Sequence, residues 1–356
     1  MKPKVSIVIP HFNRSKLLQA TLASVEAQSY DHWEVVVVDD GSSEPERTMI
    51  QQYASHKVRV LDRTGEPKGP SRSRNCGIQA SEGDYVMFLD SDDMLAPWCL
   101  ENRMRQVSQS PECDFWVFVV MLFREKPADS DDLWNHLQGS DDLGRFLRSD
   151  CPWQTTSTLW KRSALERIGG FNDQVFYGDD SDLHTRAIAS ELQYEKYPSA
   201  LPDAFIRRSD MERITNSLSP TLIASRRTRL TEGTKFLRRI NSPSNRLQDW
   251  EGQYFFELEF LLFQPGDYRE DVSKVYNEWL RDFSPSPMRR LVVGGYVKLT
   301  MMFQTKAYLL VRLARRLAMK FLPAAFFPFA VHSEPAHATA QQMETMRQLL
   351  VEAPRP

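Results

Sequence analysis

The sequence predicts an α/β protein whose central, Rossmann-like sheet is mostly parallel, with helices on both faces and a helical region after it. Three observations lead to this prediction. Short runs rich in β-branched residues alternate with helical patterns over the first two hundred residues. These runs are almost uncharged, which is typical of strands that are buried on both faces. Beyond about residue 221 the pattern turns helical.

The expected elements follow one another from the N-terminus. A strand over residues 5–9 (VSIVI) precedes a helix with Leu17, Leu18, Leu22 and Val25 on one face. Further strands are expected over 34–38 (EVVVV), 58–61 and 85–89 (YVMFL), with a helix over 75–80. Ligands bind beyond the carboxyl ends of the strands in such sheets. Polar clusters stand at these ends, at residues 10–13 (PHFN), 39–40 and 90–93 (DSDD).

Composition limits the cell compartment and the class of partner. The formal net charge of −2 argues against binding of a polyanion such as nucleic acid. The four cysteines form no CxxC pair and have no histidine at zinc spacing, which is typical of free thiols in a reducing compartment. The N-terminus lacks the pattern of a signal peptide, and no apolar run reaches the about 18 to 20 residues that span a bilayer. We therefore expect a cytoplasmic protein.

The acidic cluster at residues 90–93 follows a predicted buried strand directly. Asp90, Asp92 and Asp93 repel one another, so a bound cation would favour their folding together. Ligands that are all oxygen suit Mg²⁺ or Mn²⁺. The alternative is a solvated turn or a helix cap, where aspartate is also favoured. The preceding strand and the other strand-end clusters favour the metal site.

Two more segments carry groups that suit a nucleotide. Asp39 and Asp40 stand at a strand end, where a carboxylate can accept hydrogen bonds from a uracil imide or from ribose hydroxyls; a turn with a helix cap explains them equally well. The patterns GxGxxG and GxxxxGK[ST] do not occur, so redox dinucleotides and a P-loop lack their usual support. Arg72 and Arg74 are candidates for phosphate binding, with surface charge as the alternative for one of them.

The third acidic cluster follows a double glycine. Residues 169–171 (GGF) precede residues 178–183 (GDDSDL), where a carboxylate can act as general base on a hydroxyl. The alternative is an acidic helix N-terminus favoured by the helix dipole, with Asp182 in that role alone. We interpret the neighbouring His184 as a surface or packing residue rather than a ligand.

These motifs together resemble glycosyltransferase family 2. The segments are residues 5–14 (VSIVIPHFNR), 38–42 (VDDGS), 74–78 (RNCGI), 88–93 (FLDSDD), 169–171 (GGF) and 179–180 (DD), in the family's order and spacing. The match covers about residues 3–215. The resemblance implies a GT-A fold with a catalytic domain over residues 1–220. Its nucleotide-binding half would cover about 1–110 and its acceptor half about 111–220, followed by a helical region over 221–356.

The resemblance implies a donor site made of strand-end residues. The nucleotide-binding residues would be Pro10, Phe12, Asn13, Asp40, Arg72, Arg74, Asp90 and Ser91. Asp40 would hydrogen-bond the base and Asp90 would meet the ribose. Asp92 would bind the Mn²⁺ or Mg²⁺ ion that bridges the diphosphate. The donor would be a nucleotide-sugar, with uridine the family's commonest nucleotide.

The resemblance also implies the acceptor side. Asp180 matches the second acid of the family's Glu-Asp pair and would be the catalytic base, while Asp179 replaces the Glu. Members often carry an Arg-x-His segment after the base; residues 206–210 (IRRSD) contain no histidine, and Arg207 or Arg208 would partly replace it. Trp153 lies where acceptor contacts are expected, although tryptophan is also a common core residue.

The expected activity is transfer of a sugar to a hydroxyl, with inversion at the anomeric carbon, in the synthesis of surface polysaccharide or lipid-linked glycans. A nucleotidyltransferase is one alternative, but it would need a Gly-rich basic loop after the first strand, and residues 10–13 (PHFN) are not such a loop. A catalytically inactive binding module is the other, and the intact Asp90, Asp92 and Asp180 argue against it.

The C-terminal third has an uneven charge pattern. Residues 284–333 contain eight Lys or Arg and no acidic residue. A helix over 306–322 would gather Arg312, Arg315, Arg316 and Lys320 on one side and Leu310, Val311, Ala314, Leu317, Ala318 and Phe321 on the other, before the aromatic segment 321–329 (FLPAAFFPF). Such a helix either binds the anionic inner face of the cell membrane through 306–329 or packs its apolar side on the catalytic domain.

Overall fold

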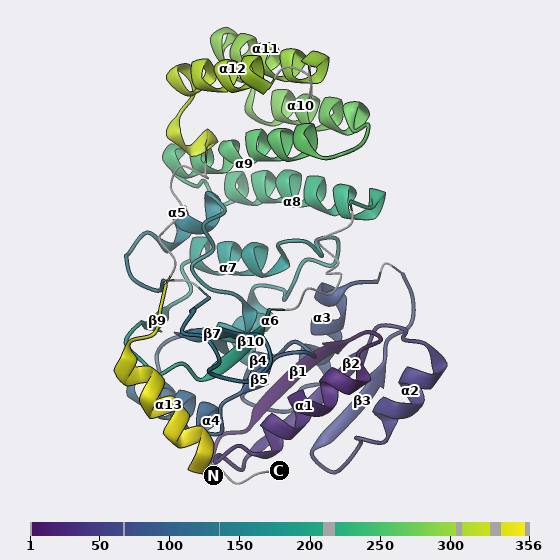
Figure 1. The fold of residues 1–356 in the computed structure, drawn as a ribbon, viewed down its shortest axis with the longest axis vertical. Helices are drawn as coiled ribbons and strands as arrows, with labels where there is room; N and C mark the ends of the chain where they lie inside the picture. The colour runs from purple at the N-terminus through teal and green to yellow at the C-terminus, as the bar shows by residue number, and fades with distance from the viewer. Residues whose placement is uncertain are drawn as a thin grey trace. The chain divides into compact units, whose positions relative to one another are not determined.

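The computed structural model describes residues 2–66, 68–134, 136–208, 218–303, 308–327 and 336–352 (Figure 1). The chain divides into two compact units. The first holds the sheets, and the second holds the helices between residues 218 and 327. Two segments fall outside the expected boundary at residue 220: Asp141–Cys151 belongs to the helical unit, and the C-terminal helix α13 (Ala340–Glu352) belongs to the unit with the sheets.

The first unit is built on a seven-stranded sheet with the order β3-β2-β1-β4-β8-β6-β9. The strands are β1 (Val5–His11), β2 (Trp33–Asp39), β3 (Val58–Asp62), β4 (Tyr85–Phe88), β6 (Phe115–Phe118), β8 (Thr158–Lys161) and β9 (Tyr194–Tyr197). Strands β3, β2, β1 and β4 are parallel, whereas β8 is antiparallel to both of its neighbours. The predicted mostly parallel sheet is confirmed, as are its four predicted strands.

Helices pack on both faces of this sheet because alternate strand residues point to opposite sides. Ile7 belongs to the core cluster that contains Leu18 and Leu22 of α1. Its neighbour Val8 faces α3 on the other side, where a Cβ added to Gly77 would lie 2.2 Å from Val8 Cγ1. The helices of the first unit, besides α13, are α1 (Ser15–Glu26), α2 (Glu44–Gln51), α3 (Pro70–Ala80), α4 (Cys99–Gln109), α6 (Arg162–Arg167) and α7 (Asp179–Ala189).

A second, three-stranded sheet has the order β5-β10-β7. Its strands are β5 (Met94–Leu95), β7 (Val120–Phe123) and β10 (Ala204–Arg207). Helix α13 packs here, with Met343 and Met346 buried in one cluster with Phe123 and Phe205. Residues 340–352 are held in place because these two methionines bury apolar surface.

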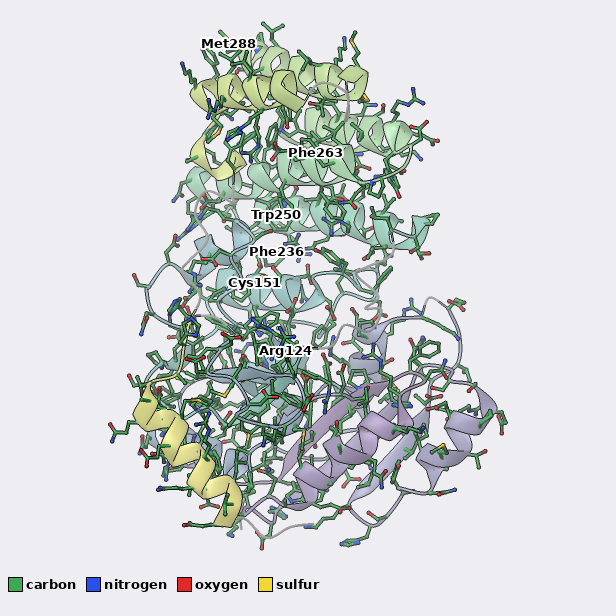
Figure 2. The ribbon with its side chains drawn as sticks, in the orientation of Figure 1. Arg124, Cys151, Phe236, Trp250, Phe263 and Met288 are labelled. Carbon is green, nitrogen blue, oxygen red and sulfur yellow. The ribbon has the colours of Figure 1, made fainter. Side chains whose placement is uncertain are left out.

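The second unit contains α5 (Asp142–Leu147), α8 (Pro220–Arg239), α9 (Ser244–Phe263), α10 (Arg269–Phe283), α11 (Pro287–Phe303) and α12 (Tyr308–Phe321). One face of α9 is apolar and buried: Trp250, Tyr254 and Leu258 are all at most 2% exposed. Trp250 is labelled in Figure 2. Helix α8 contacts this face at Gly233, where a Cβ would lie 2.2 Å from the Trp250 ring. Within the described part of the chain, no helix has the length and apolar character needed to cross a membrane.

Helix α12 differs from its predicted two-sided pattern. Arg315 faces inward and pairs with Glu259 of α9, with 2.7 Å between Arg315 Nε and Glu259 Oε1. Leu317 and Phe321, which were assigned to the apolar side, are 49% and 57% exposed, so this part of the apolar side does not pack on the protein. Of the aromatic segment, Phe326 and Phe327 are buried rather than exposed. The side chains of Leu310, Val311 and Phe329 lie outside the described residues.

Candidate active site

Asp40 lies just beyond the end of β2 and is almost fully buried. It accepts hydrogen bonds from the backbone N–H of Gly69 at 2.6 Å and from Arg63 Nε at 2.7 Å. Gly69 has a φ of +146°, a conformation that favours glycine, and α3 begins at the next residue. Asp40 therefore connects the strand ends to the start of α3. Arg63 was not among the predicted site residues, although it follows β3 directly, where the strand-end rule identifies it.

The loop after β1 is fixed against the loop after β2. Asn13 has a φ of 51°. Its N–H donates to Ser42 Oγ at 2.9 Å, and its side-chain oxygen accepts from the Ser43 N–H at 2.8 Å. The preceding Phe12 is 46% exposed, and Lys68 Nζ lies 5.4 Å from the centre of its ring. Phe12 thus offers an aromatic face next to a cation at the strand ends, while the half-buried Pro10 belongs to β1.

Arg74 is the centre of an ion-pair network. Its side chain is 6% exposed and lies on α3. One terminal nitrogen donates to Asp90 Oδ1 at 2.7 Å, and the other donates to Asp179 Oδ2 at 2.5 Å. The two carboxylates raise the pKa of Arg74 against the effect of burial. Arg74 therefore joins the end of β4 to the start of α7.

Arg72 lies two residues before Arg74 but makes different contacts. It donates to the backbone oxygen of Glu66 at 2.8 Å, and its nearest carboxylate is that of Asp173 at 3.7 Å. Its side chain is 32% exposed. The sequence left open which of the two arginines serves only as surface charge. The structure brings Arg74 to the acidic residues and leaves Arg72 at the edge.

The Gly169-Gly170-Phe171 turn is tied to α3 by Asn75. The Asn75 amide donates to the Phe171 carbonyl at 2.8 Å and its oxygen accepts from the Phe171 N–H at 2.8 Å. Gly170 has a φ of +64°, and a Cβ there would lie 2.5 Å from Asn75 Oδ1. This motif therefore has a structural role: it fixes the chain that leads into α7.

Asp92 and Asp93 are held by two arginines. Arg14 donates to Asp92 Oδ2 at 2.9 Å. Arg207 donates through its side chain to the Asp92 carbonyl at 3.1 Å and through its backbone N–H to Asp93 Oδ1 at 2.9 Å. Burial, followed by the charge of Asp90, raises the pKa of Asp92, and both effects raise the pKa of the fully buried Asp93 further. Arg14 was not among the predicted site residues, although it is the last residue of the first motif, 5–14.

The chemistry of these side chains fits a divalent cation. Asp90 uses Oδ1 for Arg74, and Asp92 uses Oδ2 for Arg14, so each carboxylate has a second oxygen. Burial raises the pKa of Asp92 and the charge of Asp90 adds to this rise; a bound cation would offset the repulsion between the two carboxylates. Oxygen donors of this kind suit Mg²⁺ or Mn²⁺. The intervening Ser91 is buried.

Asp179 and Asp180 open α7 and differ in burial. Asp179 is 9% exposed, whereas Asp180 is half-buried. Burial raises the pKa of Asp179 to about 7; the Arg74 guanidinium opposes this rise, and the charges of Asp180 and Asp90 add to it. Asp90, Asp179 and Asp180 therefore lie close enough to interact electrostatically around Arg74.

Trp153 and His184 are core residues. Trp153 is 0% exposed, with its ring centre 5.7 Å from that of His184, so it has no free surface for an acceptor sugar. His184 stacks on Trp160, and its Nδ1–H donates to the Asp180 carbonyl at 2.7 Å. This confirms the packing interpretation of His184. Asp182 pairs with Arg186 on the same helix, at 2.9 Å from Asp182 Oδ2 to Arg186 Nε.

The variant His184→Gln tests whether the buried imidazole of His184 is neutral in the folded protein. Burial lowers the pKa of His184 to about 3. The unfolded chain therefore binds a proton below about pH 6.5 that the folded chain does not, and stability falls as pH drops through this range. We expect His184→Gln to flatten this fall by about 1.4 kcal/mol per pH unit between about pH 6 and pH 4. Urea unfolding across this range measures the slope, and the exposed His56→Gln serves as the control that leaves it unchanged.

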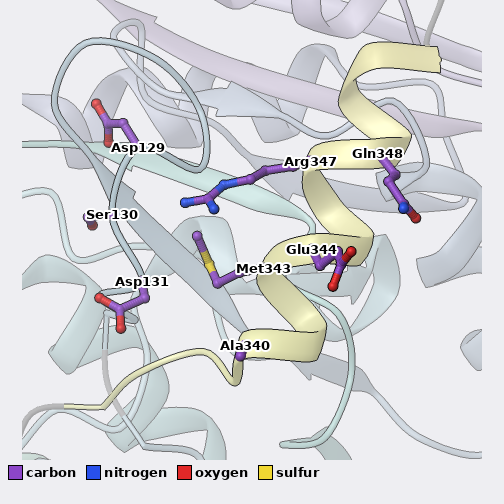
Figure 3. Close-up of a pocket in the computed structure, with 8 residues that line it drawn as sticks. All are labelled: Asp129, Ser130, Asp131, Ala340, Met343, Glu344, Arg347 and Gln348. Carbon is purple, nitrogen blue, oxygen red and sulfur yellow. The ribbon is translucent and has the colours of Figure 1, made fainter.

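A pocket elsewhere in the first unit contains none of the predicted site residues. It lies between residues 129–131 and α13, and Arg347 extends across it (Figure 3). Near this pocket, His337 Nδ1 lies 3.4 Å from Asp132 and 3.6 Å from Asp131. Arg208 donates to Asp132 at 2.7 Å, so Arg208 is directed here. Of the two arginines considered as replacements for the family's histidine, Arg207 is the one that contacts Asp92.

Comparison with known proteins agrees with these motifs. The family model described as glycosyl transferase family 2 matches residues 6–169. A GalNAc(5)-diNAcBac-PP-undecaprenol beta-1,3-glucosyltransferase of Campylobacter jejuni is 30% identical over 185 residues, which cover 51% of this chain and 58% of that protein. The putative teichuronic acid biosynthesis glycosyltransferase TuaG of Bacillus subtilis is 39% identical over 130 residues, covering 36% and 52%. The alignments span about half the length of these relatives.

The fold is shared with a solved structure. Residues 1–349 of S. aureus TarS, in complex with UDP-GlcNAc, match with a TM-score of 0.65 at 15% identity, covering 88% of this chain and 92% of that one. Likeness at this identity concerns the fold. The order of the motifs, the family match and the sheet topology lead to one conclusion. Residues 6–169 are similar to glycosyl transferase family 2, and the fold that contains them is shared with TarS.

Proposed function

We propose that this protein is a metal-dependent glycosyltransferase that moves a sugar from a UDP-sugar to a hydroxyl group and inverts the anomeric carbon. The observation that carries this proposal is the Arg74 network, in which one buried guanidinium holds Asp90 at the end of β4 and Asp179 at the start of α7. The network joins the donor-side motif to the motif that contains the base.

The nucleotide would bind at the ends of β1 and β2. The exposed ring of Phe12 offers an apolar face to a base, and Pro10 and Asn13 flank it. Asp40 would accept a hydrogen bond from the base, since Arg63 and the Gly69 N–H hold its carboxylate in place. The UDP-GlcNAc in the TarS structure supports a uridine nucleotide.

Asp92 would hold the divalent cation, and Asp90 would contact the ribose. A bound Mn²⁺ or Mg²⁺ ion neutralises the negative charge of the diphosphate as it leaves. Arg14 keeps the Asp92 carboxylate oriented, and Arg207 fixes its backbone. Arg74 keeps the Asp90 carboxylate oriented through its direct ion pair.

Asp180 would accept the proton of the acceptor hydroxyl. The acceptor oxygen then bonds to C1 of the sugar from the face opposite the diphosphate, the bond from C1 to the diphosphate oxygen breaks, and Asp180 later returns the proton to solvent. One displacement inverts the configuration once. The burial of Asp179 and its pair with Arg74 favour the more exposed Asp180 as the base.

The acceptor would be a lipid-linked or surface-polymer glycan, reached from the cytoplasmic side of the cell membrane. The names of the two curated relatives support this class, because one acts on an undecaprenol-linked glycan and the other is assigned to teichuronic acid synthesis. The acceptor would lie near Asp180. Trp153 cannot contact the acceptor because its side chain is fully buried.

A panel of nucleotide-sugars, each assayed for transfer or hydrolysis with Mn²⁺ and with a chelator, tests the proposal. We expect Asp92→Asn to lower metal-dependent turnover at least about a hundredfold, because a metal ion contributes several kcal/mol to charge stabilisation. Asp132→Asn, which removes a carboxylate from the other group of acids beside a histidine, is the matched control and should keep full turnover. Wild-type turnover that persists in chelator, or metal-stimulated turnover in Asp92→Asn, would contradict the metal assignment.

A further inference from the structure

The hairpin of α11 and α12 forms a layer of the helical unit with a packed side and an open side (Figure 1). On the packed side, Val293, Tyr296 and Val297 of α11 are buried. The Tyr296 hydroxyl donates to Glu259 Oε1 of α9 at 2.8 Å, and Arg315 of α12 pairs with the same carboxylate. These contacts fix which side of each helix is left open.

The open side of α11 carries an apolar stripe. Met288, Leu291 and Met302 are 56%, 72% and 78% exposed, and Met288 is labelled in Figure 2. Gly295 and Lys298 complete a run with spacings of three and four residues, which keeps all five positions on one face of a helix. Large apolar side chains at such exposure indicate a contact surface when they form a patch.

The open side of α12 carries two adjacent stripes. Leu313, Leu317 and Phe321, spaced by four residues, are 53%, 49% and 57% exposed. The basic stripe consists of Arg312, Arg316 and Lys320, one position before each of these, and all three are exposed. A helix turns by about 100° per residue, so the two stripes run side by side along α12.

The charge of this hairpin has one sign. Residues 284–333 contain eight Lys or Arg and no Asp or Glu. Arg289 and Arg315 are paired with glutamates of α9. Lys298 and the three cations of the basic stripe have no ion pair in the described part of the chain. The layer therefore offers unpaired cations beside exposed apolar side chains.

We infer that the open side of the α11–α12 hairpin docks on an anionic lipid surface. A bilayer with anionic headgroups suits both the exposed apolar side chains and the unpaired cations. The apolar side chains enter the interface while the cations remain at the headgroups. A second copy of the same face fits poorly, since two cationic surfaces without a carboxylate repel each other. This docking does not depend on the transfer reaction.

Vesicle flotation of the full chain tests this inference. We expect the wild type to bind phosphatidylcholine vesicles that contain about one third phosphatidylglycerol, to bind pure phosphatidylcholine weakly, and to be released by salt. Arg312→Glu, Arg316→Glu and Lys320→Glu combined should weaken binding more than about tenfold. Leu313→Ser, Leu317→Ser and Phe321→Ser combined should also weaken it. All six side chains are exposed, so circular dichroism should show an unchanged fold.

The matched control reverses an equal number of exposed cations on α8. Lys235→Glu, Arg238→Glu and Arg239→Glu make the same change in net charge, and this variant should still bind. Absence of wild-type binding to anionic vesicles, or equal losses in the α8 and α12 charge variants, overturns the inference. Sedimentation velocity tests whether the protein forms a dimer instead. If the wild type does not bind vesicles but forms a dimer that the serine variant dissociates, the face binds a second copy of the chain. Donor hydrolysis should be unchanged in every variant.

Discussion

Asp180→Asn should lower kcat for sugar transfer by about 10²- to 10⁴-fold, because the acceptor proton loses its base. The binding of UDP should stay within about threefold of the wild type, since the donor side of the site is intact. The fold should also be unchanged, because Asp180 is half-buried and the Asn side chain keeps its size. Single-turnover transfer assays and calorimetric titration with UDP separate these effects.

Asp179→Asn is the informative companion variant. Asp179 is buried and paired with Arg74, so its replacement should lower stability and turnover together. Asp180→Asn should lower turnover alone. Turnover of Asp180→Asn within about tenfold of the wild type, with a folded but inactive Asp179→Asn, would transfer the base to Asp179. Its pKa of about 7 suits proton transfer near neutral pH, so this outcome is chemically coherent.

The fold was predictable where burial alone determines the pattern. Residues 5–9 and 34–38 are mostly apolar runs as long as a buried strand needs, and both lie in strands of the central sheet. Helix α3 starts five residues before its predicted start because Pro70 fits the first turn of a helix. Helix α13 was missed because its burial rests on two methionines that contact strands far away in sequence.

The acidic residues of the candidate site were predictable from the sequence. The arginines that pair with them were less so. A strand-end rule places Asp40, Asp90 and Asp92, since parallel strands end at one edge. The choice of Arg74 over Arg72 depends on which side of α3 faces α7, and no local pattern carries this information. The exposure of Leu317 and Phe321 likewise depends on the ion pair that turns Arg315 toward α9.

The Arg74 network should contribute strongly to the stability of the folded protein. We expect Arg74→Met to lower the free energy of unfolding by about 3 to 5 kcal/mol, because it leaves the buried Asp179 carboxylate without its partner. Arg72→Met, two residues away and partly exposed, should change it by less than about 0.5 kcal/mol. Urea unfolding of both variants at pH 8 measures the difference.

The double variant Arg74→Met with Asp179→Asn distinguishes a lost charge partner from lost packing. Removing both charges should recover most of the stability, since a neutral amide carries a smaller burial penalty than an unpaired carboxylate. Turnover should stay low, because Asp90 also loses its arginine. The single Arg74→Met should in turn regain stability as pH falls below the raised pKa of Asp179, because protonation removes the unpaired charge. If the single variant is equally unstable at pH 5 and pH 8 and the double variant recovers nothing, Arg74 acts through packing, and the ion-pair network is not what holds α7 to α3.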